Sequence, residues 1–343
     1  MSLNPPVGSA GKNADGESVS QLRFWSFQAI IIFVLGWLAS NGLGDYPQTI
    51  LALAGINIIL AVSLNLVNGF TGQFSMGHAG FMAVGAYVGA SWTVYFMPLL
   101  GTSWTTDALL SQFSMLSALI MGGIVAGLIG ILVGIPSLRL KGDYLAIVTL
   151  GFGEIIRIFI LNIESIGGAR GFTGIPRIAN MYWIVGGVIL TCIFIFRIIR
   201  SIPGKEFMAV RDDETATQAM GLSTTRIKVR SFVIAAFFAG VAGALFAHYY
   251  AYLNPSTFTF SYSFQVIAMV VLGGMGSLSG SIAAALLLTV LLEVLREAQT
   301  YTYYDFRMVL YALILIIIML KRPSGLFGRK EVWTWFARKK ESA

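Results

Sequence analysis

The sequence predicts an all-α polytopic membrane protein with about 8 to 10 transmembrane helical segments, some of them broken by glycine. Of its 343 residues, 56% are hydrophobic and only 11% are charged, whereas about a quarter of an average soluble domain is charged. No Lys, Arg, Asp or Glu occurs from Ser231 to Leu292, a stretch long enough to cross a bilayer more than once. The 38 glycines fit close packing in lipid, because small residues let helix backbones approach one another.

A crossing helix needs about 20 apolar residues. On that basis, the apolar runs predict spans in chain order at 24–42, 48–68, 78–98, 114–135, 145–161, 181–199, 231–251 and 305–320. A glycine-broken pair lies at 262–275 and 280–296. At 1.5 Å per residue, the 14 residues 262–275 reach about 21 Å and the 16 residues 280–295 about 24 Å, both short of a hydrocarbon core of about 30 Å. We expect a polar cytoplasmic N-terminal extension over 1–23, a transmembrane domain over 24–320 and a basic cytoplasmic tail over 321–343.

The distribution of Lys and Arg predicts the orientation. If the N-terminus is cytoplasmic and the spans alternate, seven basic residues fall in the inner loop from Arg197 to Arg230 and seven in the tail from Lys321. Four more fall inside: Lys12, Arg23, Arg139 and Lys141. Only four fall outside: Arg170, Arg177, Arg296 and Arg307. Because short cytoplasmic loops carry an excess of Lys and Arg, both termini are expected inside.

Three clusters rich in glycine and small polar residues, at 65–78, 149–154 and 273–280, predict helices that break inside the membrane. A break frees backbone groups that lipid cannot satisfy, so protein or a water-filled cavity must surround it. Interrupted hydrophobic segments are a pointer to a transport path. The candidate path residues are Asn65, Gln73, Ser75, His78, Thr149, Glu154, Gly273, Gly274 and Ser277. The alternative, that the glycines only permit close helix packing, stays open.

Few ionisable residues lie within the predicted spans. Glu154 and Arg157 are three apart and share a helix face; an unpaired charge at the bilayer centre costs roughly 2.5 to 3.5 kcal/mol, which favours a mutual pair. That pair is either structural or functional. His78 either lines the path or is satisfied by backbone, and His248, beside Tyr249, is expected in an interfacial aromatic belt.

The segment 200–228 is the only long soluble connection, and we expect it to be cytoplasmic. Within it, the run from Arg211 to Gly221 predicts one short helix, with acidic residues near its N-terminus and a glycine stop. This helix presents Ala216, Ala219 and Met220. The interpretation favoured here is docking to a separate partner; the alternative is a solvated loop helix.

Several motifs resemble those of a known family. They are TGQFSMGHAGF from Thr71, YLAIVTLGFGEIIR from Tyr144, GFTGIP from Gly171, AVRD from Ala209, FFAGVAGALFAHY from Phe237, MVVLGGMGSLSG from Met269 and RPSGL from Arg322. Over about 56–328 the chain resembles the LivM-type permeases of ATP-binding cassette (ABC) importers for branched-chain amino acids. It departs from that pattern at 166–170, where the family's start is Thr-Gly-Gly without an Arg; the departure concerns the docking surface for a binding protein.

The resemblance implies a multi-pass subunit of the bacterial inner (plasma) membrane. Its implied partners are a second homologous permease chain, two cytoplasmic ATPases that hold ATP and Mg, and a periplasmic or extracellular substrate-binding protein. The loop over 200–228 then corresponds to the coupling helix that seats on an ATPase. The coupling residues carried over by the resemblance are Gly204, Arg211, Asp212, Glu214, Ala216 and Gly221.

The sequence contains no phosphate-binding loop, since Gly11-Lys12 and Gly204-Lys205 lack the rest of the motif. It also has no catalytic motif, and a single cysteine and two histidines argue against a Cys- or His-based metal site. The basic residues lie beside apolar segments without a nucleic-acid recognition motif. We therefore expect a non-catalytic permease, without a cofactor of its own, for small amino acids, branched-chain ones first, or alternatively for urea and short amides. A self-sufficient secondary transporter or channel is the other hypothesis.

Overall fold

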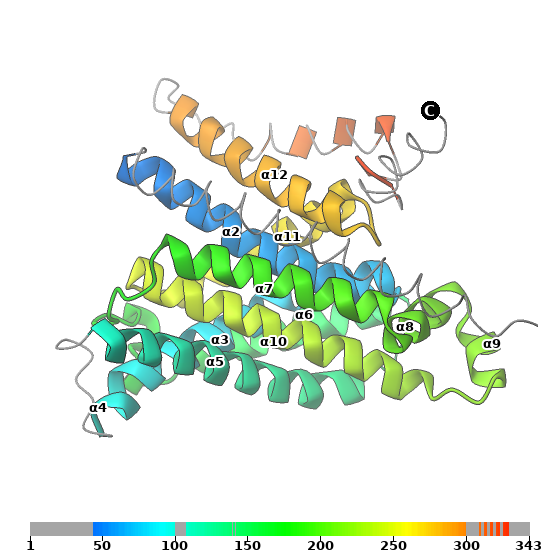
Figure 1. The fold of residues 1–343 in the computed structure, drawn as a ribbon, viewed down its shortest axis with the longest axis horizontal. Coiled ribbons are helices and arrows are strands. Elements are labelled where there is room, and N and C mark those ends of the chain that lie inside the picture. The colour runs from blue at the N-terminus through cyan, green and yellow to red at the C-terminus, as the bar shows by residue number, and fades with distance from the viewer. Residues whose placement is uncertain are drawn as a thin grey trace, which may run out of the picture.

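The computed structural model describes residues 44–99, 108–138, 140, 142–299, 309, 312–313, 316–317, 320–322 and 325–328. The predicted extension at 1–23, the span at 24–42, most of the span at 305–320 and most of the tail lie outside these residues. The regular elements of the described part are helices, and an isolated bridge joins Phe172 to Leu253. The prediction of an all-α polytopic membrane protein is confirmed (Figure 1).

The long helices follow one another in this order: α2 (Asp45–Asn65), α3 (His78–Ser91), α5 (Ala108–Ser137), α6 (Asp143–Leu161), α7 (Met181–Arg200), α8 (Ile202–Asp212), α10 (Thr224–Tyr250), α11 (Phe260–Gly273) and α12 (Leu278–Gln299). The shorter helical pieces are η1 (Leu66–Phe70), η2 (Trp92–Phe96), α4 (Met97–Leu99), η3 (Glu164–Ile166), η4 (Gly168–Arg170), α9 (Glu214–Ala219) and η5 (Pro255–Thr257). In the described part, six helices are long and apolar enough to cross a membrane: Asp45–Phe70, Leu109–Ser137, Tyr144–Leu161, Met181–Arg200, Thr224–Tyr250 and Leu278–Arg296. The total number of spans and their orientation stay predictions.

Helix α10 lies at the centre of the bundle and packs against α5, α3 and α2. Its Gly240 allows the close approach: a Cβ there would lie 2.5 Å from the carbonyl oxygen of Gly122 in α5. A Cβ on Gly85 of α3 would likewise collide with the Gly240 backbone. Three helices thus cross at three glycines, a packing that lipid-embedded helices favour. Helices α5, α10 and α7 run side by side in Figure 1, and α2 lies with α12 along another side of the bundle.

The prediction that the second member of the glycine-broken pair is too short to cross the membrane is wrong. Helix α12 begins at Leu278 and contains 22 residues, so it reaches about 33 Å at 1.5 Å per residue. Its first turn is capped, because the Ser277 hydroxyl oxygen accepts a hydrogen bond from the Gly280 N–H at 3.2 Å. This cap lets residues before Gly280 join the helix. Helix α11, with 14 residues, is short as predicted.

The predicted break at 149–154 is also wrong, because α6 continues through it as a regular helix. Here the glycines serve packing. A Cβ on Gly80 of α3 would lie 2.8 Å from the Gly153 Cα, and a Cβ on Gly77 would collide with the Thr149 carbonyl oxygen. The other two predicted breaks are present: helix is interrupted between Phe70 and His78, and between Gly273 and Leu278.

The bundle has two distinct ends. At one end, the Tyr46 hydroxyl donates to the Glu293 carboxylate at 2.8 Å, and the Trp183 indole N–H donates to Gln112 at 2.6 Å. The opposite end carries α8 and α9, which extend beyond the long helices in Figure 1. Most of the described basic residues lie at that second end: Arg197, Arg200, Lys205, Arg211, Arg226, Lys228, Arg230, Lys321 and Arg322. This asymmetry is the one that the positive-inside rule expects of a cytoplasmic end.

Candidate functional site

The two helix breaks meet at one side chain, that of Asn65. Its Oδ1 accepts a hydrogen bond from the Gly276 N–H at 2.9 Å. Its Nδ2 donates to the Ser277 carbonyl oxygen at 2.9 Å and to the Ser281 hydroxyl at 2.8 Å. Asn65 is fully buried, so these bonds satisfy backbone groups that lipid cannot. One amide on α2 therefore holds the α11–α12 break in place.

The backbones of the two breaks also touch. A Cβ on Gly69 would collide with Asn65 Oδ1 and with the Gly276 nitrogen. Gly69 belongs to η1, a π-helix that widens the end of α2. Its wider turn is closed by the Thr71 N–H, which donates to the Leu66 carbonyl oxygen at 3.1 Å. This close approach of two backbone segments requires glycine at position 69.

The α11–α12 break is covered by the C-terminal segment 325–328. The Leu326 N–H donates to the Leu272 carbonyl oxygen at 2.7 Å, and the Phe327 N–H donates to that of Gly273 at 3.3 Å. Gly274 has a φ of +110°, and a Cβ there would collide with the Gly328 carbonyl oxygen. The last carbonyls of a helix have no partner within it, so this segment provides donors to α11.

The first break is held by side chains of its own and of α6. The Asn68 side chain accepts from the Ser75 N–H at 3.1 Å. The Thr149 hydroxyl oxygen accepts from the Met76 N–H at 3.0 Å. His78 Nε2 is hydrogen-bonded to the Ser63 hydroxyl at 2.9 Å and is buried. Ser75, Thr149 and His78 thus have partners within the protein, and their role in a transport path stays a prediction.

Gln73 differs from these residues. Its side chain is only 4% exposed, and neither its Oε1 nor its Nε2 has a hydrogen-bond partner in the described part of the chain. A buried amide without a partner costs about 1 to 3 kcal/mol. Such a group is available to a polar solute or to a polar atom of another chain. Gln73 is therefore the predicted path residue that the structure leaves available for binding.

Sequence reasoning missed a second buried polar atom without a partner, the Tyr87 hydroxyl. Its ring stacks on Phe172, with the centroids 6.4 Å apart, and meets the edge of Phe258 at 6.2 Å. The available signal was a tyrosine in an otherwise small-residue stretch, 83–90, where a buried hydroxyl usually finds a partner. The aromatic group lies near the bridge between Phe172 and Leu253.

Glu154 lies apart from the breaks. Its Oε2 accepts from Arg157 Nε at 2.7 Å, and its Oε1 accepts from the Phe260 N–H at 3.1 Å. Phe260 begins α11, so the carboxylate sits at a helix N-terminus, where negative charge is stabilising. These are the contacts of a structural pair, and a transport role for Glu154 stays a prediction.

The expectation that His248 belongs to an interfacial aromatic belt is wrong for its side chain, which the protein encloses. His248 is fully buried. Its Nε2 is hydrogen-bonded to the Thr93 hydroxyl at 2.9 Å, and its Nδ1 to the Ala244 carbonyl oxygen at 2.8 Å. The reason is the central place of α10, which the neighbouring helices cover almost to its end.

The predicted single helix from Arg211 to Gly221 is two helices, α8 and α9, separated at Asp213. The Asp213 carboxylate accepts from the N–H groups of Thr215 at 2.8 Å and Ala216 at 3.0 Å, so it is the N-cap of α9. Gly221 has a φ of +82° just after α9, as its predicted role of helix stop requires.

Ion pairs fix α9 and α8 to the start of α10. Lys228 Nζ lies 2.7 Å from the Glu214 carboxylate, and Arg230 lies 3.7 Å from that of Glu206. Gly204 is buried at the turn from α7, where a Cβ would collide with the Ile199 carbonyl oxygen. On α9 and at the residue that follows it, the exposed side chains are Thr215, Ala216, Gln218, Ala219 and Met220, the last of them 82% exposed.

Arg211 is directed into the protein, whereas its neighbour Asp212 is exposed. Asp212 is 63% exposed and lies 3.0 Å from the Arg211 guanidinium. Arg211 is only 19% exposed, and its Nη1 donates to the Gly69 carbonyl oxygen at 3.3 Å. The last residues of α8 thus reach the first helix break. Of the coupling candidates, Asp212, Ala216 and Gly221 are exposed, whereas Gly204 and Arg211 face the protein.

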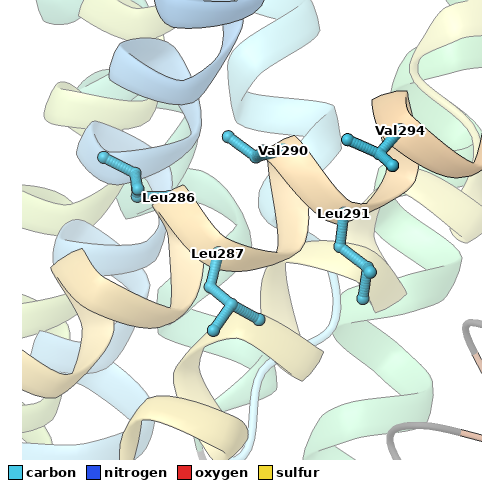
Figure 2. Close-up of a pocket in the computed structure, with 5 residues that line it drawn as sticks. All are labelled: Leu286, Leu287, Val290, Leu291 and Val294. Atoms are coloured by element: carbon cyan, nitrogen blue, oxygen red, sulfur yellow. The ribbon is translucent and has the colours of Figure 1, made fainter.

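The outer surface of α12 carries an open apolar groove, shown in Figure 2. Its lining is Leu286, Leu287, Val290, Leu291 and Val294. This lining suits lipid or an apolar helix, not a zwitterion. Among the described residues, no group of three or more His, Cys, Asp or Glu gathers in a way that could hold a metal ion.

Comparison with known proteins gives a consistent result. The family profile described as "Branched-chain amino acid transport system / permease component" matches residues 46–319. The high-affinity branched-chain amino acid transport system permease protein LivM of Salmonella typhimurium is 36% identical over 349 residues, 91% of this chain and 76% of that protein. The probable LivM of Methanocaldococcus jannaschii is 26% identical, covering 86% and 97%. The high-affinity branched-chain amino acid transport system permease protein LivH of S. typhimurium is 28% identical, covering 80% of this chain and 92% of that protein.

Proposed function

The chain belongs to the family of branched-chain amino acid transport permease components, and from this premise we propose that it is the non-catalytic membrane subunit of an ATP-driven ABC importer. It is a multi-pass protein of the bacterial inner membrane. The proposed cargo is small amino acids, branched-chain ones first, with urea and short amides as the alternative within the family.

The observation that carries the ATP-driven proposal is the exposed tip of α9. Ala216 and Met220 face outward at the end of the bundle rich in basic residues, while Glu214 ties the same helix to Lys228 on α10. A short helix with small side chains and one exposed methionine suits insertion into a groove of a partner. We infer that this partner is an ATPase, and that the α8–α9 end is cytoplasmic.

The proposal includes further partners. The chain is similar both to LivM and to LivH of one organism, which supports pairing with a second, LivH-like permease chain. The proposed complex also contains two cytoplasmic ATPases and an external substrate-binding protein. ATP and Mg bind on the ATPases, and this chain needs no cofactor.

In the proposed mechanism, the external protein delivers the solute and ATPase closure moves α8 and α9. The two helix breaks joined at Asn65 then shift relative to each other. The surrounding helices thereby open the transport path alternately to the outside and to the inside. Gln73 offers a buried amide whose bonding capacity is unused. A side-chain amide of this kind can accept a hydrogen bond from an amino acid's ammonium group or donate one to its carboxylate.

The test uses the complete transporter in proteoliposomes, with the ATPases inside. Met220→Arg places a charge in the proposed groove, so ATPase association and ATP-driven leucine uptake should both fall, while membrane insertion stays normal. Ala169→Arg, on an exposed turn at the opposite end, should leave ATPase association unchanged.

The alternatives give different results in the same assay. Concentrative uptake by the purified chain without nucleotide would overturn the ABC proposal and favour a secondary transporter. Uptake of urea or acetamide, but not of leucine, would retain the ATP-driven mechanism and assign the other cargo.

A further inference from the structure

We propose that Arg211 is a positioning residue that links the cytoplasmic helices to both helix breaks in the membrane. In this proposal its guanidinium does not dock the ATPase; it transmits the movement of α8 to η1 and to the α11–α12 break. The inference rests on the proposed function, because movement of α8 is attributed there to an ATPase.

The first contact is with the α2 end. Arg211 Nη1 donates to the Gly69 carbonyl oxygen at 3.3 Å, and Gly69 lies in the π-helix η1. In a π-helix the hydrogen bonds run from i to i+5, and such turns are frequent at functional sites. Arg211 thus holds a segment whose hydrogen bonding already differs from that of an α-helix.

The second contact is with the other break. A Cβ on Gly276 would lie 3.4 Å from Arg211 Nη1, so the guanidinium is next to this glycine as well as next to Gly69. Gly276 is also the residue whose N–H donates to Asn65. One guanidinium nitrogen therefore lies where the two breaks meet, beside the bond that joins them.

The aliphatic part of the Arg211 side chain is packed as closely as its guanidinium group. Gly72 has a φ of +72°, and a Cβ there would lie 2.8 Å from Arg211 Cγ and 3.2 Å from its Cα. The contact therefore covers the length of the side chain. A movement of the α8 backbone at position 211 cannot leave the first break where it is, because densely packed groups transmit displacement.

Asp212 fixes the direction of the guanidinium. Arg211 Nε and Nη2 each lie 3.0 Å from Asp212 Oδ1 on the exposed side. The planar guanidinium can donate to this carboxylate and to the Gly69 carbonyl at the same time. A lysine has one charged nitrogen and cannot reproduce that arrangement.

Docking of an ATPase directly on Arg211 explains the geometry less well. Its side chain is 19% exposed and directed at the breaks, whereas Met220, on the neighbouring α9, is 82% exposed. The two functions are thus divided: α9 offers the docking surface, and the end of α8 contacts the membrane part.

The experiment compares Arg211→Gln, Arg211→Lys and wild type in the complete reconstituted transporter. ATPase co-purification, ATP hydrolysis and leucine uptake are measured on the same preparations. We expect normal co-purification in both variants and a fall of about five-fold or more in uptake per ATP hydrolysed, the lower end of usual coupling effects. Arg226→Gln, an exposed arginine at the start of α10, is the charge-matched control and should keep the wild-type ratio.

Two results would overturn the proposal: a wild-type uptake-to-ATP ratio in Arg211→Gln, or loss of ATPase association with a normal ratio in the complexes that remain. If Arg211→Gln does not assemble, Asp212→Ala decides, because it keeps the arginine and removes the oxygen that orients it. A reduced ratio in Asp212→Ala supports the proposal, and a normal one contradicts it. Failure of the proposed function itself is seen separately, as absence of ATP-driven uptake in wild type.

Discussion

Tyr262 and Asn57 are hydrogen-bonded across the interface of α11 and α2: the tyrosine hydroxyl donates to Asn57 Oδ1 at 2.9 Å. Asn57 Nδ2 in turn donates to the Thr289 hydroxyl on α12 at 2.9 Å. One buried amide thus connects three helices, and it lies two turns along α2 from Asn65, which joins the breaks. The polar contacts of α2 with α11 and α12 form two levels, at Asn57 and at Asn65.

Tyr262→Phe is expected to lower the free energy of unfolding in detergent by about 1 kcal/mol, because it leaves Asn57 Oδ1 without a donor in a buried place. Thermal unfolding of the purified protein measures the change. Tyr144→Phe is the matched control, because Tyr144 is 72% exposed; it should unfold as wild type does. Equal effects of the two substitutions would mean that the Asn57 bond adds nothing to stability.

A pair of glycines tests the contact between the breaks. Gly69→Ala should destabilise the protein by roughly 1 to 3 kcal/mol, as overpacking does, because the added methyl collides with Asn65 and Gly276. Gly151→Ala adds the same methyl inside α6, where nothing lies within 4 Å of it. That change should be neutral or stabilising by up to about 1 kcal/mol, since alanine is the better helix former. Denaturation midpoints of the two variants, measured side by side, separate crowding from helix propensity; a stable Gly69→Ala protein would contradict the close approach.

The positions of most spans in the described part follow from the sequence, because a long apolar run can be recognised without knowing which helices pack against it. The breaks at Gly69 and Gly274 were predictable for a related reason, since there glycine occurs together with amide and hydroxyl residues that can bond freed backbone. Gly151 and Gly153 occur in a similar cluster, yet they lie in a regular helix. A glycine that admits a neighbouring helix and a glycine that ends one cannot be told apart without that neighbour.

The candidate site depends on contacts between distant segments even more than the helix breaks do. Arg211 was recognisable as a loop residue, but its direction depends on Asp212 and on the Gly69 carbonyl, 142 residues away along the chain. His248 lies beside two tyrosines in the sequence, which indicated an interface; its burial follows from the helices packed around α10. The partners of Asn65 are more than 200 residues away along the chain, and no local pattern indicates them.

Gln73→Leu is expected to separate stability from transport. The substitution removes a buried amide without a partner, so the isolated subunit should become more stable, by about 1 kcal/mol. If the amide contacts the solute or the second permease chain, leucine uptake by the complete transporter should fall at the same time. Asn68→Leu is the control of similar size in the same break: its amide is hydrogen-bonded to the Ser75 backbone, so it should lose stability. Destabilisation by Gln73→Leu would show that the amide does have a partner in the folded subunit.

Two truncations test the segment that covers the α11–α12 break. A chain that ends after Gly328 keeps the N–H groups of Leu326 and Phe327, which donate to Leu272 and Gly273; a chain that ends after Ser324 loses them. Both lack the residues after 328, so their difference reports the four residues 325–328 alone. The shorter chain should be less stable by about 2 kcal/mol, because two backbone hydrogen bonds at roughly 1 kcal/mol each are lost and the last carbonyls of α11 are left without donors. Thermal unfolding of both chains in the same detergent measures this difference, and equal midpoints would mean that lipid, water or another part of the protein satisfies those carbonyls equally well.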